Sequence, residues 1–299
     1  MAATTEARHR QAEGLDGLPP SEILSVLLDG QLSAVESVRN ALPSIENAAR
    51  LAASKIASGG RLIYAGAGSS GLMALSDGLE LPGTFGIAPE QALILLAGGA
   101  DSLELLAGGY EDDEVLAEED VTNANVSARD CLIGVSASGS TPYTVRAAAV
   151  AKAHGASVIG IANNADTPLL NGADVAILLQ TPPEAVAGST RMGAGTAQKI
   201  TLNMISTLTA VHLGHVHDGF MVNLRADNDK LRDRARRIVS VIAGTDIEKA
   251  GHLLEEADGS VKIAVLLAAG ADGAQSAGKL LESCNQNLRS ALKKAKAGS

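Results

Sequence analysis

Two turns rich in glycine and hydroxyl groups carry the clearest chemical signal in this sequence. The first, GAGSSG, spans residues 66–71, and the second, GVSASGSTP, spans residues 134–142. Each follows an apolar run typical of a strand and precedes a helical pattern. Backbone N–H groups and the positive end of a helix dipole therefore converge on each turn, which predicts an anion site.

Hydroxyls and amides can surround the three oxygens of a phosphomonoester without a metal ion. An alternative is that the Ser and Thr residues only cap the following helices. Their presence in two matching turns favours phosphate. The candidate ligands are Ser69, Ser70, Ser136, Ser138, Ser140 and Thr141.

The first turn also matches GxGxxG, the pattern of dinucleotide-binding folds. That pattern requires an acidic residue at the end of the second strand, about 20 residues further on. Here the second strand ends in Gly98-Gly99, and Asp101 lies too far along the chain. The mismatch argues against a dinucleotide, and we predict that the protein uses no cofactor.

The segment GSTRMGAGTAQK, residues 188–199, offers the cations that a phosphate or carboxylate requires. Arg191 and Lys199 are the candidates, and Ser189 and Thr190 belong to the turn that precedes a long apolar helix. Three histidines further along the chain, His212, His215 and His217, resemble a metal cluster only in composition. Because they lack a defined ligand spacing, no metal site is predicted.

The elements that must position these groups follow from the hydrophobic pattern. Apolar runs at RLIYAG, QALILLAGG, CLIGVSAS, SVIGIAN and DVAILLQ alternate with helical patterns, which indicates a parallel sheet covered on both faces. Residues 21–57 read as two helices preceded by a break at Pro19 and Pro20. Further helices are expected at 195–216, at 227–242 and, three in number, after Asp246.

Composition excludes several classes of function. The chain has 299 residues, a formal charge of −10 and 2% aromatic residues, which disfavours a nucleic-acid surface. Its longest apolar stretch, residues 200–213, is too short for a membrane span and contains Asn203 and His212. Cys131 and Cys284 are too few for a disulfide framework. A cytoplasmic protein with no nucleic-acid or membrane partner is expected.

The phosphate turns resemble those of SIS (sugar isomerase) domains, in which SxSGxT follows a strand. One branch is more similar still: the N-acetylmuramic acid 6-phosphate etherases and the related glucokinase regulatory proteins. The shared motifs include TEAR and LDGL near the start, GAGSSG, ELPGTFG, AGG, GYED, SASGSTPY and AGSTRMGAGTAQKITLNMIST. They cover nearly the whole chain, and the last block is long and idiosyncratic.

The resemblance implies an etherase that eliminates the lactyl ether of a sugar phosphate and then adds water, giving N-acetylglucosamine 6-phosphate and D-lactate. The catalytic glutamates of the family fall on Glu80 in LELPGTFG and Glu111 in GYED. Glu80 is expected to protonate the leaving oxygen, and Glu111 to remove the proton at C2. From the residues alone, both would read as solvated acids.

The resemblance also implies the architecture. We expect a flavodoxin-like, doubly wound α/β domain of the SIS type at residues 50–240, preceded by a helical arm at 1–49. A small helical domain is expected at 241–299. A homodimer is predicted, because the apolar helix at 196–213 is unsuited to face water and because the family completes its site across a subunit interface.

Three basic residues of the family pattern are replaced here, by Leu72, Ser140 and Gly193. Their loss predicts weak activity on N-acetylmuramic acid 6-phosphate and tighter binding of a sugar phosphate without the lactyl group. Two alternatives to the etherase therefore stay open. One is a sugar-phosphate isomerase, and the other is a sugar-phosphate sensor without catalytic activity.

Overall fold

The computed structural model describes residues 4–103, 108–224, 226 and 228–297. The chain divides into two compact units. Unit 1 comprises Met1–Leu79 and Glu90–Ser206, and unit 2 comprises Glu80–Pro89 and Thr207–Ser299. The division into three parts at residues 49 and 240 stays a prediction.

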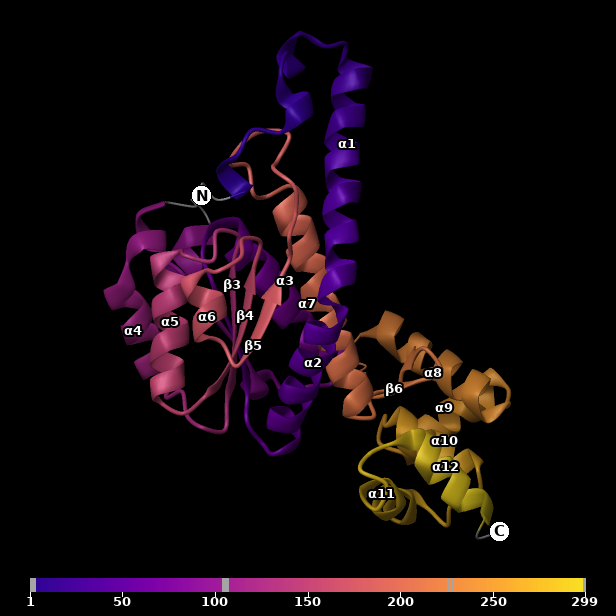
Figure 1. Cartoon of the computed structure of the whole chain (residues 1–299). Helices are drawn as coiled ribbons and strands as arrows, with labels where there is room; N and C mark the ends of the chain where they lie inside the picture. The colour runs from indigo at the N-terminus through magenta and orange to yellow at the C-terminus, as the bar shows by residue number, and fades with distance from the viewer. Residues whose placement is uncertain (1–3, 104–107, 225, 227, 298–299) are drawn as a thin grey trace. The chain divides into compact units, whose positions relative to one another are not determined.

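Unit 1 is built on a parallel sheet of five strands (Figure 1). The strands are β1 (Leu62–Gly66), β2 (Ala92–Leu96), β3 (Cys131–Ser136), β4 (Ser157–Ala162) and β5 (Val175–Leu178). Their order, β2-β1-β3-β4-β5, is that of flavodoxin-like doubly wound folds. All five strands lie within the apolar runs predicted from the sequence, and the predicted fold class is confirmed.

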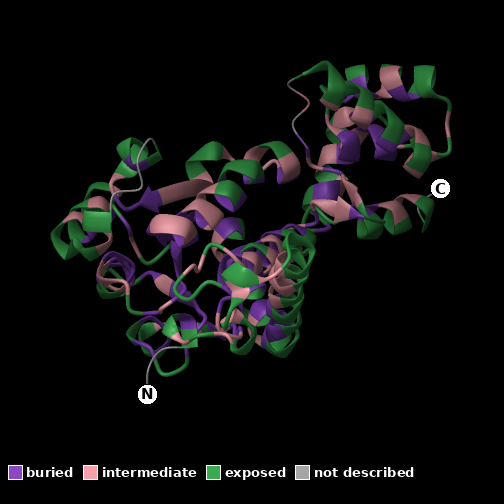
Figure 2. Ribbon diagram, turned by 90° about the horizontal axis from the view of Figure 1, so that it is seen from above, coloured by how far each residue is buried: buried purple, intermediate pink, exposed green. Residues whose placement is uncertain are grey.

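Both faces of the sheet are covered, which is why its strands are apolar throughout. On one face, Ile63 and Leu132 belong to a buried cluster with side chains of α4 (Glu114–Asn123), α5 (Pro142–Ala153) and α6 (Pro168–Gly172). On the other face, Tyr64 donates a hydrogen bond to Asp77 of α3 (Gly68–Phe85) over 2.9 Å. Buried positions concentrate in the strands and on the inner sides of these helices (Figure 2).

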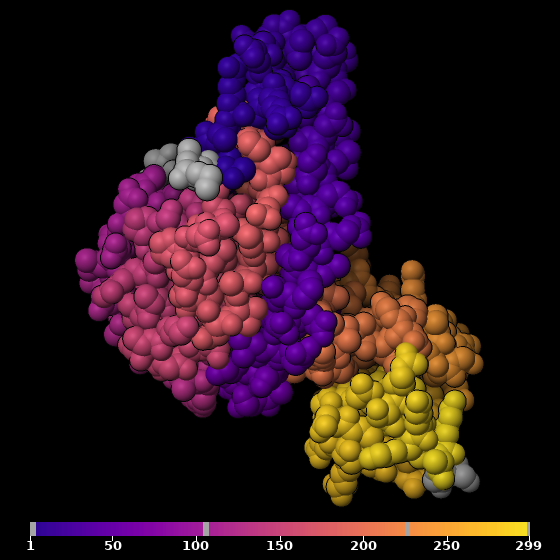
Figure 3. All heavy atoms as spheres, viewed as in Figure 1, coloured from indigo at the N-terminus to yellow at the C-terminus, as the bar shows by residue number. Residues whose placement is uncertain are grey.

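The two N-terminal helices are α1 (Pro20–Ser37) and α2 (Leu42–Ala57), joined by a short 3₁₀ turn, Val38–Ala41. α1 begins at Pro20, one residue before the predicted start, with Pro19 as its N-cap, because proline is favoured at the first helical position. α2 packs on the sheet, whereas α1 has a broad exposed side at the surface of unit 1 (Figure 3).

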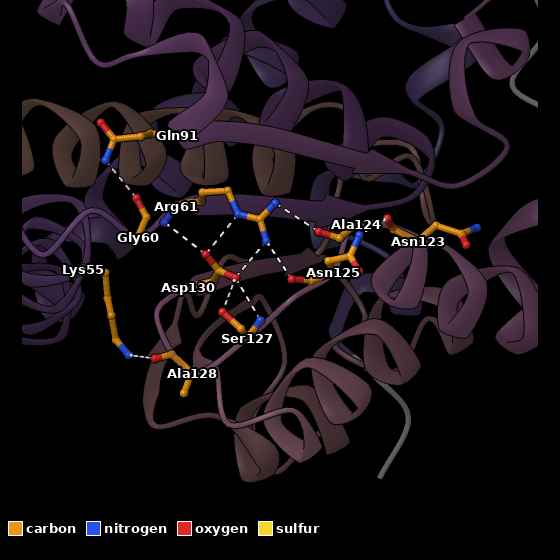
Figure 4. A network of polar contacts seen from close by, with 10 residues as sticks. All are labelled: Lys55, Gly60, Arg61, Gln91, Asn123, Ala124, Asn125, Ser127, Ala128 and Asp130. Carbon is orange, nitrogen blue, oxygen red and sulfur yellow. Dashed lines mark hydrogen bonds and ion pairs between the residues drawn. The ribbon is translucent and has the colours of Figure 1, made fainter.

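A polar network holds together the amino ends of β1 and β3, at the edge of the sheet opposite the glycine-rich turns (Figure 4). The Arg61 guanidinium forms two hydrogen bonds with Asp130, over 3.0 and 2.8 Å, and also donates to the carbonyls of Ala124 and Asn125. The Asp130 side chain is 3% exposed. This buried, bidentate pair fixes where the two central strands begin.

The expected apolar helix is α7 (Gly193–His212), which begins two residues earlier than predicted and ends at His212, not at Val216. Its side chains Ala197, Leu202, Ile205 and Ala210 are already buried within the chain. The apolar character of α7 therefore needs no partner subunit to explain it. Among the described residues, no helix combines the length and the apolar character that crossing a bilayer requires.

Unit 2 is mainly helical. After a hairpin of two-residue strands, β6 (Val216–His217) and β7 (Phe220–Met221), come α8 (Asp229–Ala243), α9 (Ile247–Glu256), α10 (Val261–Ala268), α11 (Ala274–Glu282) and α12 (Leu288–Ala297). The prediction of three helices after Asp246 was wrong, because the last of them is divided in two. Asn285 and Gln286 have positive φ values of 50° and 61°, and this left-handed turn ends α11.

Candidate functional site

The two glycine-rich turns meet at the carboxyl edge of the sheet. β1 and β3 are hydrogen-bonded neighbours with Gly66 opposite Val135, so the turns that follow them lie side by side. The chain runs outward from this pair in both directions, to β2 on one side and to β4 on the other. Such a switch point is where open α/β sheets bind their ligands.

The first turn brings helix α3 very close to strand β1. An ideal Cβ atom on Gly66 would lie 2.9 Å from the Cα atom of Gly71, so a side chain at residue 66 has no room. Gly68 has a φ of +51°, a conformation that favours glycine. Ser70 is buried and Ser69 is half-buried at the start of α3.

The second turn contains a cluster of three hydroxyls. The Ser136 hydroxyl lies 2.8 Å from that of Thr141 and 3.2 Å from that of Ser138, and it accepts a hydrogen bond from the Gly139 backbone N–H over 3.0 Å. Ser136 is only 1% exposed, whereas Ser138 and Thr141 are half-buried and Ser140 is exposed. Ser136 thus holds the turn from inside, and the Ser138 and Thr141 side chains, whose hydroxyls are directed to it, are the more accessible part of the cluster.

The capping alternative can be examined at α5, which starts at Pro142 directly after this turn. Thr141 occupies the N-cap position, yet its side chain makes no capping hydrogen bond. Its hydroxyl is directed instead to Ser136 and Ser138. The first backbone N–H groups of α5 are therefore not occupied by the Thr141 hydroxyl, which favours an anion site over a simple cap.

Glu111 lies against the first turn. It belongs to a short 3₁₀ helix, Gly108–Asp112, and a Cβ atom added to Gly68 would come within 2.4 Å of its Oε1 atom. Burial, and secondarily the neighbouring charge of Asp112, raise the pKa of the Glu111 carboxyl above its ordinary value. A raised pKa makes the carboxylate a stronger base.

The turn that carries Arg191 is fixed by a buried carboxylate. Glu184 is 5% exposed and accepts hydrogen bonds from the N–H groups of Gly193 and Ala194, over 2.9 and 2.8 Å. Helix α7 is thereby capped by Glu184. The side chains of Arg191 and Lys199 are exposed, and neither side chain forms an ion pair or hydrogen bond with another residue in the part of the chain that the structure describes.

Comparison with known proteins identifies the family. The SIS domain model matches residues 31–163. An N-acetylmuramic acid 6-phosphate etherase of Deinococcus radiodurans is 43% identical over 96% of this chain and 94% of its own length. An etherase of the same name from Streptomyces coelicolor is 42% identical over 97% and 93% of the respective chains. This chain belongs to the N-acetylmuramic acid 6-phosphate etherase family.

Another etherase relative, from Geobacillus thermodenitrificans, is 40% identical and covers 96% of this chain and 98% of its own. Among solved structures, a phosphoheptose isomerase from Francisella tularensis aligns with a TM-score of 0.50 at 19% identity. That alignment covers 65% of this chain and 98% of the isomerase. It supports the SIS fold of this etherase-family chain.

Unit 1 therefore brings together the two predicted phosphate turns and Glu111. Ser189 and Thr190 are half-buried in the turn before α7. Glu80 lies on the part of α3 that belongs to unit 2, and its side chain is exposed. The roles predicted for all these residues stay predictions. In the described segments, His, Cys, Asp and Glu side chains form no group of three or more that could hold a metal ion.

Sequence reasoning missed Asn163 and Asn164, which follow β4 at the same edge of the sheet. Asn163 donates to Thr181 over 3.2 Å and accepts from Gln198 of α7 over 2.9 Å, and it is 1% exposed. Two adjacent asparagines at the carboxyl end of a parallel strand were a usable signal. Glu184 was also missed, and its spacing in the sequence gave no indication of a cap.

Proposed function

We propose that this protein cleaves the lactyl ether of N-acetylmuramic acid 6-phosphate and releases D-lactate and N-acetylglucosamine 6-phosphate. The observation that carries the proposal is the meeting of two hydroxyl-rich turns at the β1/β3 switch point, with the Glu111 carboxylate against Gly68. The names of the related etherases support the choice of substrate.

Two carboxylates divide the proton transfers. Glu111 takes the proton from C2 of the sugar, and its raised pKa suits it to that task. Glu80 gives a proton to the ether oxygen as the bond between that oxygen and C3 breaks. The ether oxygen therefore leaves as the hydroxyl group of lactate. Water then adds to the unsaturated sugar, its hydroxyl at C3 and a proton at C2.

The substrate carries two anionic groups, and different residues recognise them. The phosphate lies at the starts of α3 and α5, with hydroxyls such as Ser70 and Ser138 around it. Arg191 and Lys199 are free to bind the lactyl carboxylate, because Leu72, Ser140 and Gly193 supply no cation. A side chain at residue 193 would crowd both Ala34 and Glu184, since an ideal Cβ lies 3.1 Å from each.

Lactate release from N-acetylmuramic acid 6-phosphate tests the reaction. Wild type should release lactate, and Glu111→Gln and Glu80→Gln should each lose at least about a hundredfold in rate. Glu119→Gln is the matched control, because Glu119 is exposed on α4. NMR in heavy water should show deuterium at C2 of the product. Interconversion of aldose and ketose phosphates without lactate would identify an isomerase instead.

A second titration tests how the anions are recognised. Arg191→Ala should weaken binding of the lactyl substrate about tenfold or more and leave binding of N-acetylglucosamine 6-phosphate unaffected, because only the former carries the carboxylate. Ser138→Ala should weaken binding of both compounds by a similar factor. Efficient lactate release by wild type would contradict the hypothesis of an altered substrate that the three lost cations raised.

A homodimer is also part of the proposal, formed through α1. Leu24, Leu28 and Leu32 are 66%, 59% and 56% exposed, and their spacing of four places them on one face of that helix. An exposed apolar stripe of this kind is typical of an interface. A second copy presenting the same stripe would cover it, as two-fold symmetry requires.

Sedimentation at micromolar concentration tests the dimer. Wild type should sediment as a dimer, and Leu28→Glu as a monomer. Val115→Glu, at a position on α4 that is 68% exposed, should remain dimeric as the control. A monomeric wild type would contradict the dimer. We further propose a cytoplasmic location, supported by two buried cysteines that form no disulfide.

A further inference from the structure

The N-terminal residues Thr4–Glu6 lie beside the candidate site although they are far from it in sequence. The Thr4 N–H donates to Oδ1 of Asn164 over 2.8 Å, and Thr5 is only 4% exposed. The Thr5 carbonyl accepts from the Gly188 N–H over 3.2 Å. Gly188 precedes the Ser-Thr-Arg turn, so this segment touches a second predicted substrate loop as well.

Asn164 connects the segment to the phosphate turn. It is 7% exposed, and its Nδ2 group donates to the Thr5 hydroxyl and to the Ala137 carbonyl, each over 3.1 Å. Ala137 lies in the phosphate turn between Ser136 and Ser138. One amide side chain thus joins the N-terminal segment to the backbone of that turn, and both of its polar atoms are used.

We propose that Asn164 and Thr5 are positioning residues of the sugar-phosphate site, which hold the phosphate turn and the Ser-Thr-Arg turn at a fixed separation. Neither of them touches the reacting atoms. Their effect is on the position of the turn that follows Ala137 and leads to the start of α5, where the phosphate is proposed to bind. The inference rests on the proposed function in taking residues 136–141 as the phosphate subsite.

The chemistry of the contacts sets the orientation of the Asn164 amide. The Thr4 N–H needs an acceptor, and the Ala137 carbonyl, which also accepts from the Asn163 N–H over 3.0 Å, can only accept, so Oδ1 and Nδ2 cannot be exchanged. Asp at residue 164 would keep the volume and the contact with Thr4 but would place a carboxylate oxygen against the Ala137 carbonyl. Asn164→Asp is therefore the sharpest perturbation, and Thr5→Val removes a single hydroxyl at nearly constant volume.

The experiment measures binding and turnover separately in the full chain. Calorimetric titration with N-acetylglucosamine 6-phosphate gives Kd, and lactate release gives KM and kcat. We expect Asn164→Asp to raise Kd and KM about tenfold or more and Thr5→Val about fivefold, with kcat within twofold. Thr5→Ser should restore wild-type values, and Asn171→Ala, at an exposed asparagine of α6, should not change them.

Unchanged Kd and KM in folded Asn164→Asp and Thr5→Val, with a wild type that binds normally, would overturn the positioning role alone. A fall in kcat at constant KM would also overturn it, because a loss of folded protein has that signature. If Asn164→Asp does not fold, Thr5→Val and its serine rescue decide the matter. Absence of sugar-phosphate binding by wild type would overturn the proposed function itself.

Discussion

Lys262, near the start of α10, carries an amine that is buried in unit 2 without a polar partner among the described residues. The residue is 2% exposed, and its Nζ atom has no hydrogen-bond partner among the residues that the structure describes. Burial lowers the pKa of Lys262 to about 8. Nearby His215 also has a buried Nδ1 atom without a partner, and burial together with the Lys262 charge lowers the pKa of His215 to about 4.

The size of the destabilisation follows from the pKa. A fall from 10.5 to about 8 corresponds to about 3 kcal/mol, at about 1.4 kcal/mol for each pH unit. Between these two values the unfolded chain binds more protons than the folded chain, so the stability rises with pH. The full free-energy cost of burying the charged amine is present below pH 8 and disappears above about pH 10.5.

We therefore expect Lys262→Met to stabilise unit 2 by about 2 to 3 kcal/mol at pH 7. Urea unfolding followed by circular dichroism, together with amide exchange in α10, measures the change. The gain over wild type should shrink steadily from pH 8 to pH 10. Lys279→Met is the control, because Lys279 is exposed on α11. A destabilised Lys262→Met, or a gain independent of pH, would refute the reasoning.

Other predictions concern unit 1. Arg61→Ala leaves the buried Asp130 carboxylate unpaired and should lower the free energy of unfolding by about 3 kcal/mol; a loss below about 1 kcal/mol in urea unfolding contradicts this. Gly68→Ala places Cβ 2.4 Å from Oε1 of Glu111 and should slow lactate release on the order of a hundredfold in a folded protein. Burial and, to a smaller extent, the charge of Asp112 raise the pKa of Glu111. Asp112→Asn should therefore shift the acid limb of the pH profile of kcat/KM to lower pH. An acid limb that does not move argues against Glu111 as the base.

The sheet could be predicted because each of its strands is short, apolar and bounded by turn residues. Fully buried strands such as Cys131–Ser136 have no polar alternation that could be mistaken for another element. The hairpin of β6 and β7 was missed, because strands of two residues have no periodicity to detect. The break between α11 and α12 coincides with Asn285 in a left-handed conformation. It could not be predicted, because many helical sequences contain an asparagine without such a break.

The candidate site could be predicted where it follows from strand ends and not where it follows from long-range contacts. The turns at 66–71 and 134–142 were found from local pattern alone. The acidic run at residues 111–113 reads as a solvated loop, and only the fold places Glu111 against Gly68. The Asn164 contact with Thr4 spans 160 residues, and no local periodicity encodes such a pairing.

The starts of α5 and α7 differ in what they leave available to a ligand. α7 is closed to an anion, because Glu184 already accepts from Gly193 and Ala194 and adds a negative charge there. At α5, Thr141 leaves the helix end uncapped and joins a hydroxyl cluster instead. We therefore expect the phosphate to bind at the start of α5 and not at that of α7. We also expect Arg191, which follows Gly188, to bind the other anionic group of the substrate, so that separate loops would recognise the two negative groups.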